Sequence, residues 1–362
     1  MAAPDIGQVQ SAHPFPAYAG QTYYGIPPLK HSHYGLKTAT GFFLQGIGSS
    51  AQMIATIGDL LDRETNRKLI RMGRMLSFLA SPAGPLMFVA ALHTPKRWYN
   101  MLRIFKPTSP MSIGIWTLTK MSGFNTVALA GNLLADEGMG NIGKWLDRLS
   151  GILAAAAGGL VSVYMGTEIE ETSMPIWIGA FPFVSPLVAA TSFSNGVAAL
   201  SLAASFNGDS EGTLRRLRRI GGFSSASQTA LACLMSRGLR RSVGRSPIRR
   251  RTMAAIWSGL LAPAALRALD MRSGRASSIR VDIAALAGGA AIMAALVLAG
   301  RKSGNIPQDY FELTSAPALP EPAPGDRSIR DGRRRASKKA LWGVAVAAGL
   351  IACFAGSRRL ST

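Results

Sequence analysis

The sequence predicts an all-α polytopic membrane protein, and three observations support this fold class. Of the 362 residues, 48% are hydrophobic and only 16% are charged, whereas soluble domains carry about 25% charged residues. The apolar residues occur in long blocks, and a block of about 18 residues or more is long enough for a transmembrane helix. The chain also has 39 glycines, and small residues within such blocks let helices pack closely in lipid.

Eight apolar blocks follow one another along the chain, and each is predicted to be a membrane-spanning helix. They lie at residues 39–61, 70–93, 112–135, 149–166, 181–206, 220–235, 253–269 and 281–299. The second block contains the run Ser81-Pro-Ala-Gly-Pro85, which predicts a bend. A membrane helix tolerates such prolines when neighbouring helices satisfy the carbonyl groups that they free.

These blocks define the organisation of the chain. Residues 1–36 form a polar N-terminal segment and residues 37–301 form the transmembrane core. Residues 302–339 are rich in Pro and Arg and predict a mobile linker. Residues 340–357 form a further apolar block with cations on both sides. This block predicts an additional C-terminal helix that either spans the membrane or lies in its interface.

The connection between the second and third spans has its own pattern. Residues 95–105 alternate cations with aromatic and aliphatic side chains, which predicts a segment in the headgroup region. Pro107 disfavours helical backbone at Lys106. Ser109 and Pro110 are typical of the N-cap and the first turn of a helix, here the third span.

The formal net charge of +21 would suggest nucleic-acid binding in a soluble protein. Here the cations cluster at the ends of apolar blocks, as in Arg63, Arg67, Lys68, Arg71 and Arg74. Cations in these places anchor helix ends and meet anionic lipid. We therefore expect membrane lipid as a partner and no nucleic acid. Both alternating sets of loops are basic, so the positive-inside rule leaves the orientation open.

Histidine and cysteine usage predicts no haem, iron–sulfur cluster or metal in this chain. A b-type haem in a membrane bundle usually needs a pair of histidines that face each other across helices. Only His93 ends a span, and the other three histidines precede the first span. Cys233 and Cys353 lie in separate blocks, without partners at metal-site spacing.

Polar groups at membrane depth are candidates for function because they are costly there. Lys120 lies well inside the third span. In a functional role it would relay protons or donate a hydrogen bond to a quinone carbonyl. In a structural role its amine would extend to the membrane interface or pair with a buried carboxylate. Asp59 and Tyr164 lie near the ends of the first and fourth spans. Carboxylate and phenol groups can hydrogen-bond the oxygens of a quinone and exchange its protons, although tyrosine is also a common membrane anchor. Residues 167–173, "TEIEETS", predict an acidic loop among basic ones.

Several motifs, taken in order, resemble the NrfD-type membrane subunits of the polysulfide reductase family. They are "TYYGIPPLK" (22–30), "FFLQGIGSSAQ" (42–52), "SPAGPLM" (81–87), "TPKRWYNMLRIFKPTSPMSIG" (94–114) and "YMGTEIEETSMPIW" (164–177). The likeness extends from about residue 22 to about residue 313, and "NMLRIFKPTSPMSIG" is its specific part.

The resemblance implies an eight-helix core arranged as two four-helix bundles, with a quinone or quinol site. It implies exchange of electrons between menaquinone or ubiquinone and a ferredoxin-like iron–sulfur subunit, in the bacterial cytoplasmic (inner) membrane. That partner would connect to a molybdopterin oxidoreductase or another redox module. Tyr164 matches the tyrosine of the family's Y-x-(G/A) motif, and Gln45 falls in the segment that lines the quinone site, where Gly is more usual.

The sequence also departs from the family pattern. Relatives commonly read D-L-G-R-P at the end of the second span, and this chain reads A-L-H-T-P at residues 91–95. Ala91 therefore replaces the acid, and His93, whose ordinary pKa is near neutrality, would be a substitute proton carrier. Lys120 is a second departure, because the family pattern is usually apolar at this place in the third span.

Three functions stay open on the sequence. The first is an electron-transfer subunit, not catalytic alone, whose candidates for the quinone and its protons are Gln45, Asp59, His93, Lys120, Tyr164 and Glu168. The second is an ion- or solute-translocating module, because spans interrupted by Gly and Pro occur in transporters; no repeat between the two halves supports it. The third is a structural anchor without quinone chemistry, which the replacement at Ala91 favours.

Overall fold

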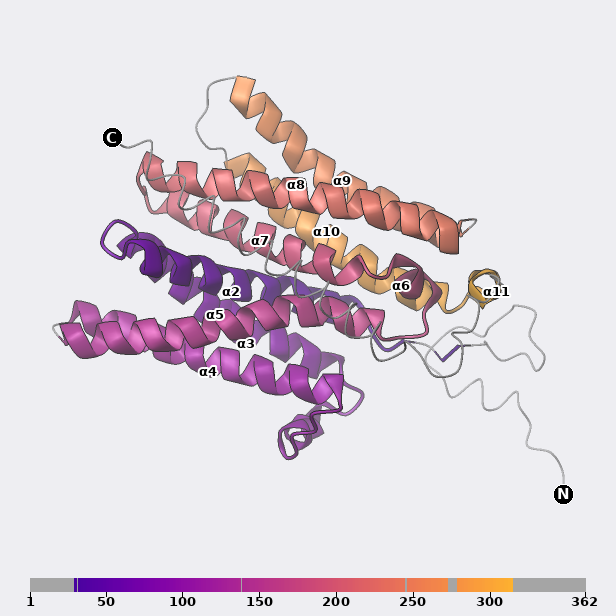
Figure 1. Ribbon diagram of the computed structural model, residues 1–362, viewed down its shortest axis with the longest axis horizontal. Helices are drawn as coiled ribbons and strands as arrows, with labels where there is room; N and C mark the ends of the chain where they lie inside the picture. The colour runs from indigo at the N-terminus through magenta and orange to yellow at the C-terminus, as the bar shows by residue number, and fades with distance from the viewer. Residues whose placement is uncertain (1–28, 31, 138, 245, 273–278, 315–362) are drawn as a thin grey trace, which may run out of the picture.

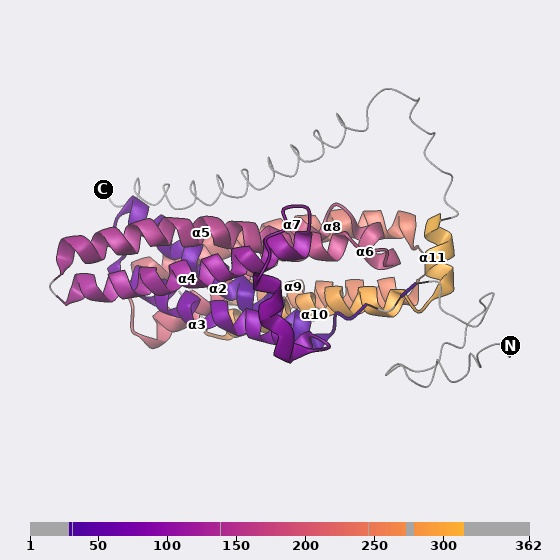
Figure 2. The same cartoon turned by 90° about the horizontal axis from the view of Figure 1, so that it is seen from below.

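The computed structural model describes residues 29–30, 32–137, 139–244, 246–272 and 279–314. Over these residues the regular structure is helical, with no strand. Eight long helices run back and forth along the long dimension of the molecule (Figures 1 and 2). They are α2 (Leu36–Leu61), α3 (Arg67–Ala91), α4 (Pro110–Asp136), α5 (Gly140–Glu170), α7 (Val184–Phe206), α8 (Glu211–Ser242), α9 (Pro247–Arg272) and α10 (Ile279–Ser303). The predicted all-α polytopic membrane fold is confirmed.

Three short helices join or follow the long ones. They are the 3₁₀ helix η1 (Pro95–Leu102), α6 (Pro175–Ala180) and α11 (Pro307–Thr314). By length and composition, five of the described helices could cross a membrane, namely α3, α5, α7, α9 as far as Asp270, and α10. The polar N-terminal residues 1–28, residues 315–339 of the predicted linker and the apolar block at 340–357 lie outside the described residues. The prediction of a linker from residue 302 is wrong for its first part, because α10 continues to Ser303 and residues 307–314 form α11.

The long helices form two groups. In the first group α2 packs on α3, α4 packs on α5, and α2 also contacts α5. In the second group α7 packs on α8, α9 packs on α10, and α7 also contacts α10. The two groups meet where α2 and α5 contact α7 (Figure 1). This arrangement agrees with two four-helix bundles.

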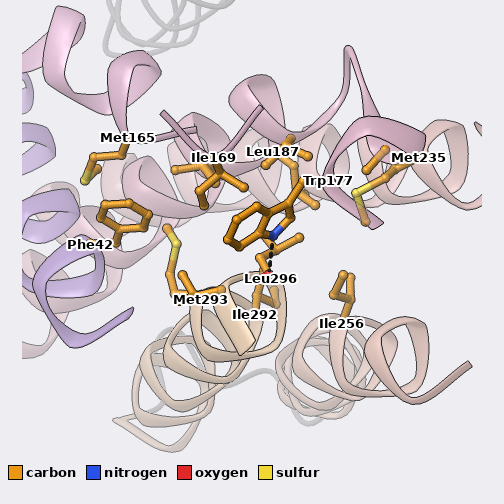
Figure 3. Packing of buried hydrophobic residues seen from close by; sticks show 14 of the residues in the cluster. Phe42, Met165, Ile169, Trp177, Leu187, Met235, Ile256, Ile292, Met293 and Leu296 are labelled. Carbon is orange, nitrogen blue, oxygen red and sulfur yellow. Dashed lines mark hydrogen bonds between the residues drawn. The ribbon is translucent and has the colours of Figure 1, made fainter. Parts of the chain in front are cut away.

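Buried apolar side chains fill the junction between the groups. Trp177 of α6 is fully buried, and its indole N–H donates to the carbonyl oxygen of Leu296 on α10 at 2.8 Å. Figure 3 shows Phe42, Met165 and Ile169 from the first group on one side of this indole. The indole lies against Gly300, where a Cβ atom would overlap it. α6 is therefore fixed to the second group by both packing and a hydrogen bond.

Helix α3 passes through Pro82 and Pro85 without ending. A proline removes the hydrogen bond to the carbonyl four residues earlier, so Pro85 frees the carbonyl of Ser81. The Ser122 hydroxyl of α4 donates to that oxygen at 3.3 Å. A neighbouring helix thus satisfies the freed group, as the sequence predicts for a proline in a membrane helix.

The start of α4 also follows the sequence. Ser109 is the N-cap, its hydroxyl accepts from the backbone N–H of Ser112, and Pro110 is the first helical residue. η1 has no buried residue. Ile104 and Phe105 just after it are 75% and 53% exposed, which fits a segment that meets lipid headgroups.

Some predicted helix ends are wrong. The fourth span was predicted at 149–166, whereas α5 covers 140–170, and the sixth was predicted at 220–235, whereas α8 covers 211–242. Charged side chains continue these helices beyond their apolar blocks, because Lys, Arg and Glu are good helix formers. For the same reason the predicted loop at 167–173 is helical as far as Glu170.

Candidate functional site

A phenol–carboxylate pair lies at the end of the molecule that carries α6 and α11, called the near end below. The Tyr34 hydroxyl donates to Oε1 of Glu168 at 2.9 Å. Tyr34 directly precedes α2, and Glu168 lies in the last turn of α5. Burial and the neighbouring Glu168 carboxylate raise the pKa of Tyr34 well above its usual value. The phenol is therefore protonated near neutral pH and acts as a donor.

Tyr164 lies one helical turn before Glu168, so both side chains are on one face of α5. Its ring packs directly on Gly114 of α4, where any Cβ atom would overlap the ring. The side chain is half-buried, and no hydrogen-bond partner for its hydroxyl is found among the described residues. A phenol with unused hydrogen-bonding capacity thus stands beside the Tyr34–Glu168 pair.

Glu170, in the last turn of α5, holds the end of α5 against the start of α7. Its Oε1 accepts from the backbone N–H groups of Val184 and Ser185 at 3.0 and 3.2 Å, and its Oε2 accepts from the Ser185 hydroxyl at 2.5 Å. A carboxylate at the N-terminus of α7 is favoured by the free N–H groups and the helix dipole. The acidic run after Tyr164 is therefore partly structural, and it fixes the end of α5 that carries Glu168.

Gln45 lies deeper in the bundle. It is fully buried, and its Nε2 approaches the sulfur of Met121 on α4 at 3.2 Å. Its Oε1 has no hydrogen-bond partner in the described part of the chain and faces Gly84 of α3. α2 and α5 are antiparallel, and Ser49 pairs with Ser162. Gln45 therefore lies at about the same level along the bundle as Tyr164, but it is fully buried whereas Tyr164 is half-buried.

Asp59 lies at the opposite end of the first group, the far end, where the α2–α3 and α4–α5 turns are. It is buried together with Asp147 of α5. The donors to the two carboxylates are Arg63, Arg74, Arg148 and Asn132, at N···O distances of 2.6–3.1 Å. Burial acts to lower the pKa of Arg63, but hydrogen bonds to Asp147 and Asp59 outweigh it and raise the pKa. Asp59 therefore belongs to an ionic cluster that joins four helices.

His93 and Lys120 lie apart from these groups. His93 is exposed just beyond the end of α3, and Lys120 is exposed on the outer face of α4. A lysine in that place can extend its amine along the helix to the interface. The structure thus brings Tyr164 and Glu168 together and leaves Asp59, His93 and Lys120 at a distance from them.

Sequence reasoning missed Tyr34. This residue is in the polar segment before the first span, and its partner is 134 residues further along the chain. The sequence around Tyr34 shows only a tyrosine just ahead of an apolar block. A tyrosine in that place is also typical of a membrane anchor, so the pattern does not indicate a functional site.

The fold and these polar groups define a multi-pass membrane protein with a half-buried phenol–carboxylate site at one end of a helical bundle. The family model described as "Polysulphide reductase, NrfD" matches residues 29–301, and the chain belongs to this family. Comparison with curated proteins finds no match. The protein is therefore a membrane subunit of an oxidoreductase complex of the polysulfide reductase type, and subunits of this family partner in general with iron–sulfur and molybdopterin catalytic subunits.

Proposed function

We propose that this subunit exchanges electrons between the quinone pool and an iron–sulfur partner, with coupled uptake or release of protons. The observation that carries the proposal is the Tyr164 hydroxyl, without a partner among the described residues, one helical turn from the half-buried Tyr34–Glu168 pair. In a membrane protein, a cluster of this kind indicates a functional site.

The residues fit the chemistry of a quinone. Its two oxygens accept hydrogen bonds as a quinone and donate them as a quinol, and a phenol can serve both forms. Tyr164 would hold one oxygen, and the Glu168 carboxylate would take or return a proton. Tyr34 would fix the Glu168 carboxylate through its hydrogen bond. When bound, the quinone supplies the two-electron chemistry. Menaquinone and ubiquinone share these oxygens, so the three residues suit either.

Gln45 and His93 complete the proposed set at the near end, in different ways. Gln45 has an unused amide oxygen deeper in the bundle, where it would meet protons on their way to or from Glu168. His93 is exposed in the connection between the end of α3 and η1, where it would exchange protons with water. Lys120 and Asp59 stay predictions; Lys120 faces outward and Asp59 belongs to the far end.

The partner in this proposal is a ferredoxin-like iron–sulfur subunit, attached to a molybdopterin oxidoreductase or another redox module, in the bacterial cytoplasmic membrane. Electron transfer requires a short distance between donor and acceptor, so the iron–sulfur subunit would dock at the near end. The exposed side chains that follow α3, such as Trp98 and Tyr99 of η1, lie on that side of the first group.

The test is quinol-dependent reduction of the partner by the intact complex carrying Tyr164→Phe. We expect the KM for quinol to rise and turnover to fall, because the hydroxyl contacts the substrate. Tyr310→Phe in α11 is the control, since it removes a phenol hydroxyl outside the site. Unchanged quinol affinity and turnover in Tyr164→Phe would remove Tyr164 from the site. A purified complex that retains no quinone and ignores quinone-site inhibitors would favour the structural anchor.

A further inference from the structure

The second helix group holds a buried carboxylate that no cation contacts. Asp282, in the first turn of α10, is 8% exposed. Arg218 of α8 and Arg267 of α9 are the cations that act on this carboxylate. No ion pair within 4.0 Å joins Asp282 to either arginine in the described part of the chain. The three charged groups therefore lie near one another without direct contact.

The groups around Asp282 keep unused hydrogen-bonding capacity. Oδ2 of Asp282 is buried and has no partner among the described residues. Ser201 of α7 lies beside the carboxylate, but its hydroxyl does not reach hydrogen-bond geometry with Oδ2. Nη2 of Arg218 is also buried without a hydrogen bond, and Oε2 of Glu211 is 3.8 Å from it. Folded proteins pair nearly all such atoms, so an acceptor and a donor together indicate a bound group that both donates and accepts.

The face of α8 that carries Arg218 has open space in front of it. Arg218, Gly222 and Ser225 are four and three residues apart, so they share one face of the helix. Nη1 of Arg267 donates to the Ser225 hydroxyl at 3.1 Å, so this face is turned toward α9. At Gly222, no atom lies within 4 Å of an added Cβ atom. The space beside the two guanidinium groups is therefore unfilled at this point.

The region between α8 and α9 is open to the membrane. These two helices contact each other less than the other neighbouring pairs of the second group, and they diverge toward the α9–α10 connection (Figure 1). In the same stretch of α9, Ala264, Ala265 and Ala268 are exposed. A lipid molecule can therefore approach Arg218 and Arg267 from the side.

The charged groups lie at the level of lipid headgroups. Residues 283–300 of α10 carry no charge, and these 18 residues rise about 27 Å at 1.5 Å per residue. This length is close to the hydrocarbon core of a bilayer, about 30 Å, so Asp282 lies at its boundary. The start of α8 is at the far end of the molecule, because Nη1 of Arg216 donates to Oδ1 of Asn66 in the α2–α3 turn at 2.9 Å.

We propose that Arg218, Arg267 and Asp282 bind the headgroup of a zwitterionic phospholipid that carries a primary amine, phosphatidylethanolamine. The guanidinium groups donate to its phosphate oxygens, and its ammonium group donates to Oδ2 of Asp282. A choline headgroup has no N–H to donate, and an anionic headgroup without an amine leaves Asp282 unpaired. This headgroup site is in the second helix group, away from the quinone residues, and it does not depend on the proposed function.

The experiment uses the whole complex, stripped of lipid in detergent and titrated with short-chain phosphatidylethanolamine. Native mass spectrometry detects the bound lipid, and the rise in unfolding temperature gives its affinity. We expect Asp282→Asn to bind the lipid about tenfold more weakly than wild type, the size expected for one hydrogen bond to a charged group. Phosphatidylcholine and phosphatidylglycerol should bind wild type with a similarly reduced affinity.

Two further variants complete the test. Arg218→Gln should also weaken phosphatidylethanolamine binding about tenfold. Arg219→Gln is the matched control, because this neighbouring arginine is exposed on another face of α8, and it should keep the wild-type affinity. If Asp282→Asn does not assemble, Arg218→Gln decides in the same way, since its side chain is 32% exposed.

Three outcomes would overturn the headgroup site. Equal affinities for the three lipids would show that the amine is not recognised. Unchanged affinity in Asp282→Asn and Arg218→Gln would show that the lipid binds elsewhere and that water separates these charges. Soluble phosphoethanolamine that binds as tightly as the lipid would show that the site takes a free phosphate ester instead of a membrane component.

Discussion

The hydroxyl of Tyr34 donates a hydrogen bond to Glu168 across 134 residues of sequence, and this bond ties the segment before α2 to the end of α5. The Tyr34 ring also lies 5.9 Å from the ring of Trp177 on α6. One side chain thus links the first helix group, the carboxylate of the candidate site and the junction with the second group.

Replacing Tyr34 with Phe should therefore weaken both the fold and the site. A hydrogen bond to a charged group contributes about 1.5–3 kcal/mol, and partial exposure of both residues places the loss toward the lower value. Thermal unfolding in detergent measures this change, with Tyr99→Phe as the control because its side chain is 55% exposed. Equal unfolding temperatures for Tyr34→Phe and wild type would contradict a stabilising role.

The protonation of Tyr34 gives a separate prediction at high pH. Its pKa is raised in the folded state, so the folded state holds the phenol proton more tightly than the unfolded state. The corresponding stability is complete below about pH 10, the ordinary tyrosine pKa, and is lost as the pH rises through the folded-state pKa. Absorbance titration at alkaline pH, subtracting Tyr34→Phe from wild type, isolates this phenol. An ionisation step below pH 10 in the difference would contradict the raised pKa.

Gly114 is predicted to be essential for the position of Tyr164. Gly114→Ala places a methyl group where the Tyr164 ring packs, and overpacking of this kind costs about 1–3 kcal/mol. We expect a higher KM for quinol as the ring is displaced. Gly123→Ala on the same helix is a matched control, because no atom lies within 4 Å of its added Cβ. That control should be neutral or more stable, since Ala favours helices over Gly by about 1 kcal/mol. Similar effects in the two variants would show that loss of glycine alone matters.

The sequence predicted the membrane fold well, because apolar blocks long enough to cross a bilayer show regardless of tertiary contacts. It was less able to place the ends of α5 and α8, where charged residues extend the helices. It placed Tyr164 and Glu168 in one candidate set, and the structure puts them a single turn apart. It did not indicate that Lys120 is exposed, because lipid-facing and protein-facing sides of a membrane helix are both apolar, so hydrophobicity does not tell them apart.

The last prediction concerns the ionic cluster at the far end. The Arg74 and Asp147 side chains are both 0% exposed, and Nε of Arg74 lies 2.8 Å from Oδ1 of Asp147. Asp147→Ala would leave Arg74 as a buried charge without its carboxylate, and such a change costs about 3–5 kcal/mol. The control is Asp136→Ala, which removes a carboxylate paired with Arg71 at the surface. Exposed pairs contribute about 0–1 kcal/mol.

Unfolding of the two variants in detergent tests this difference, and we expect a much larger loss of stability for Asp147→Ala. Comparable losses would mean that water reaches Arg74 and screens its charge. In that case the far end would be open to solvent as far as α3, which is deeper in the bundle than the exposed side chain of Arg148 indicates.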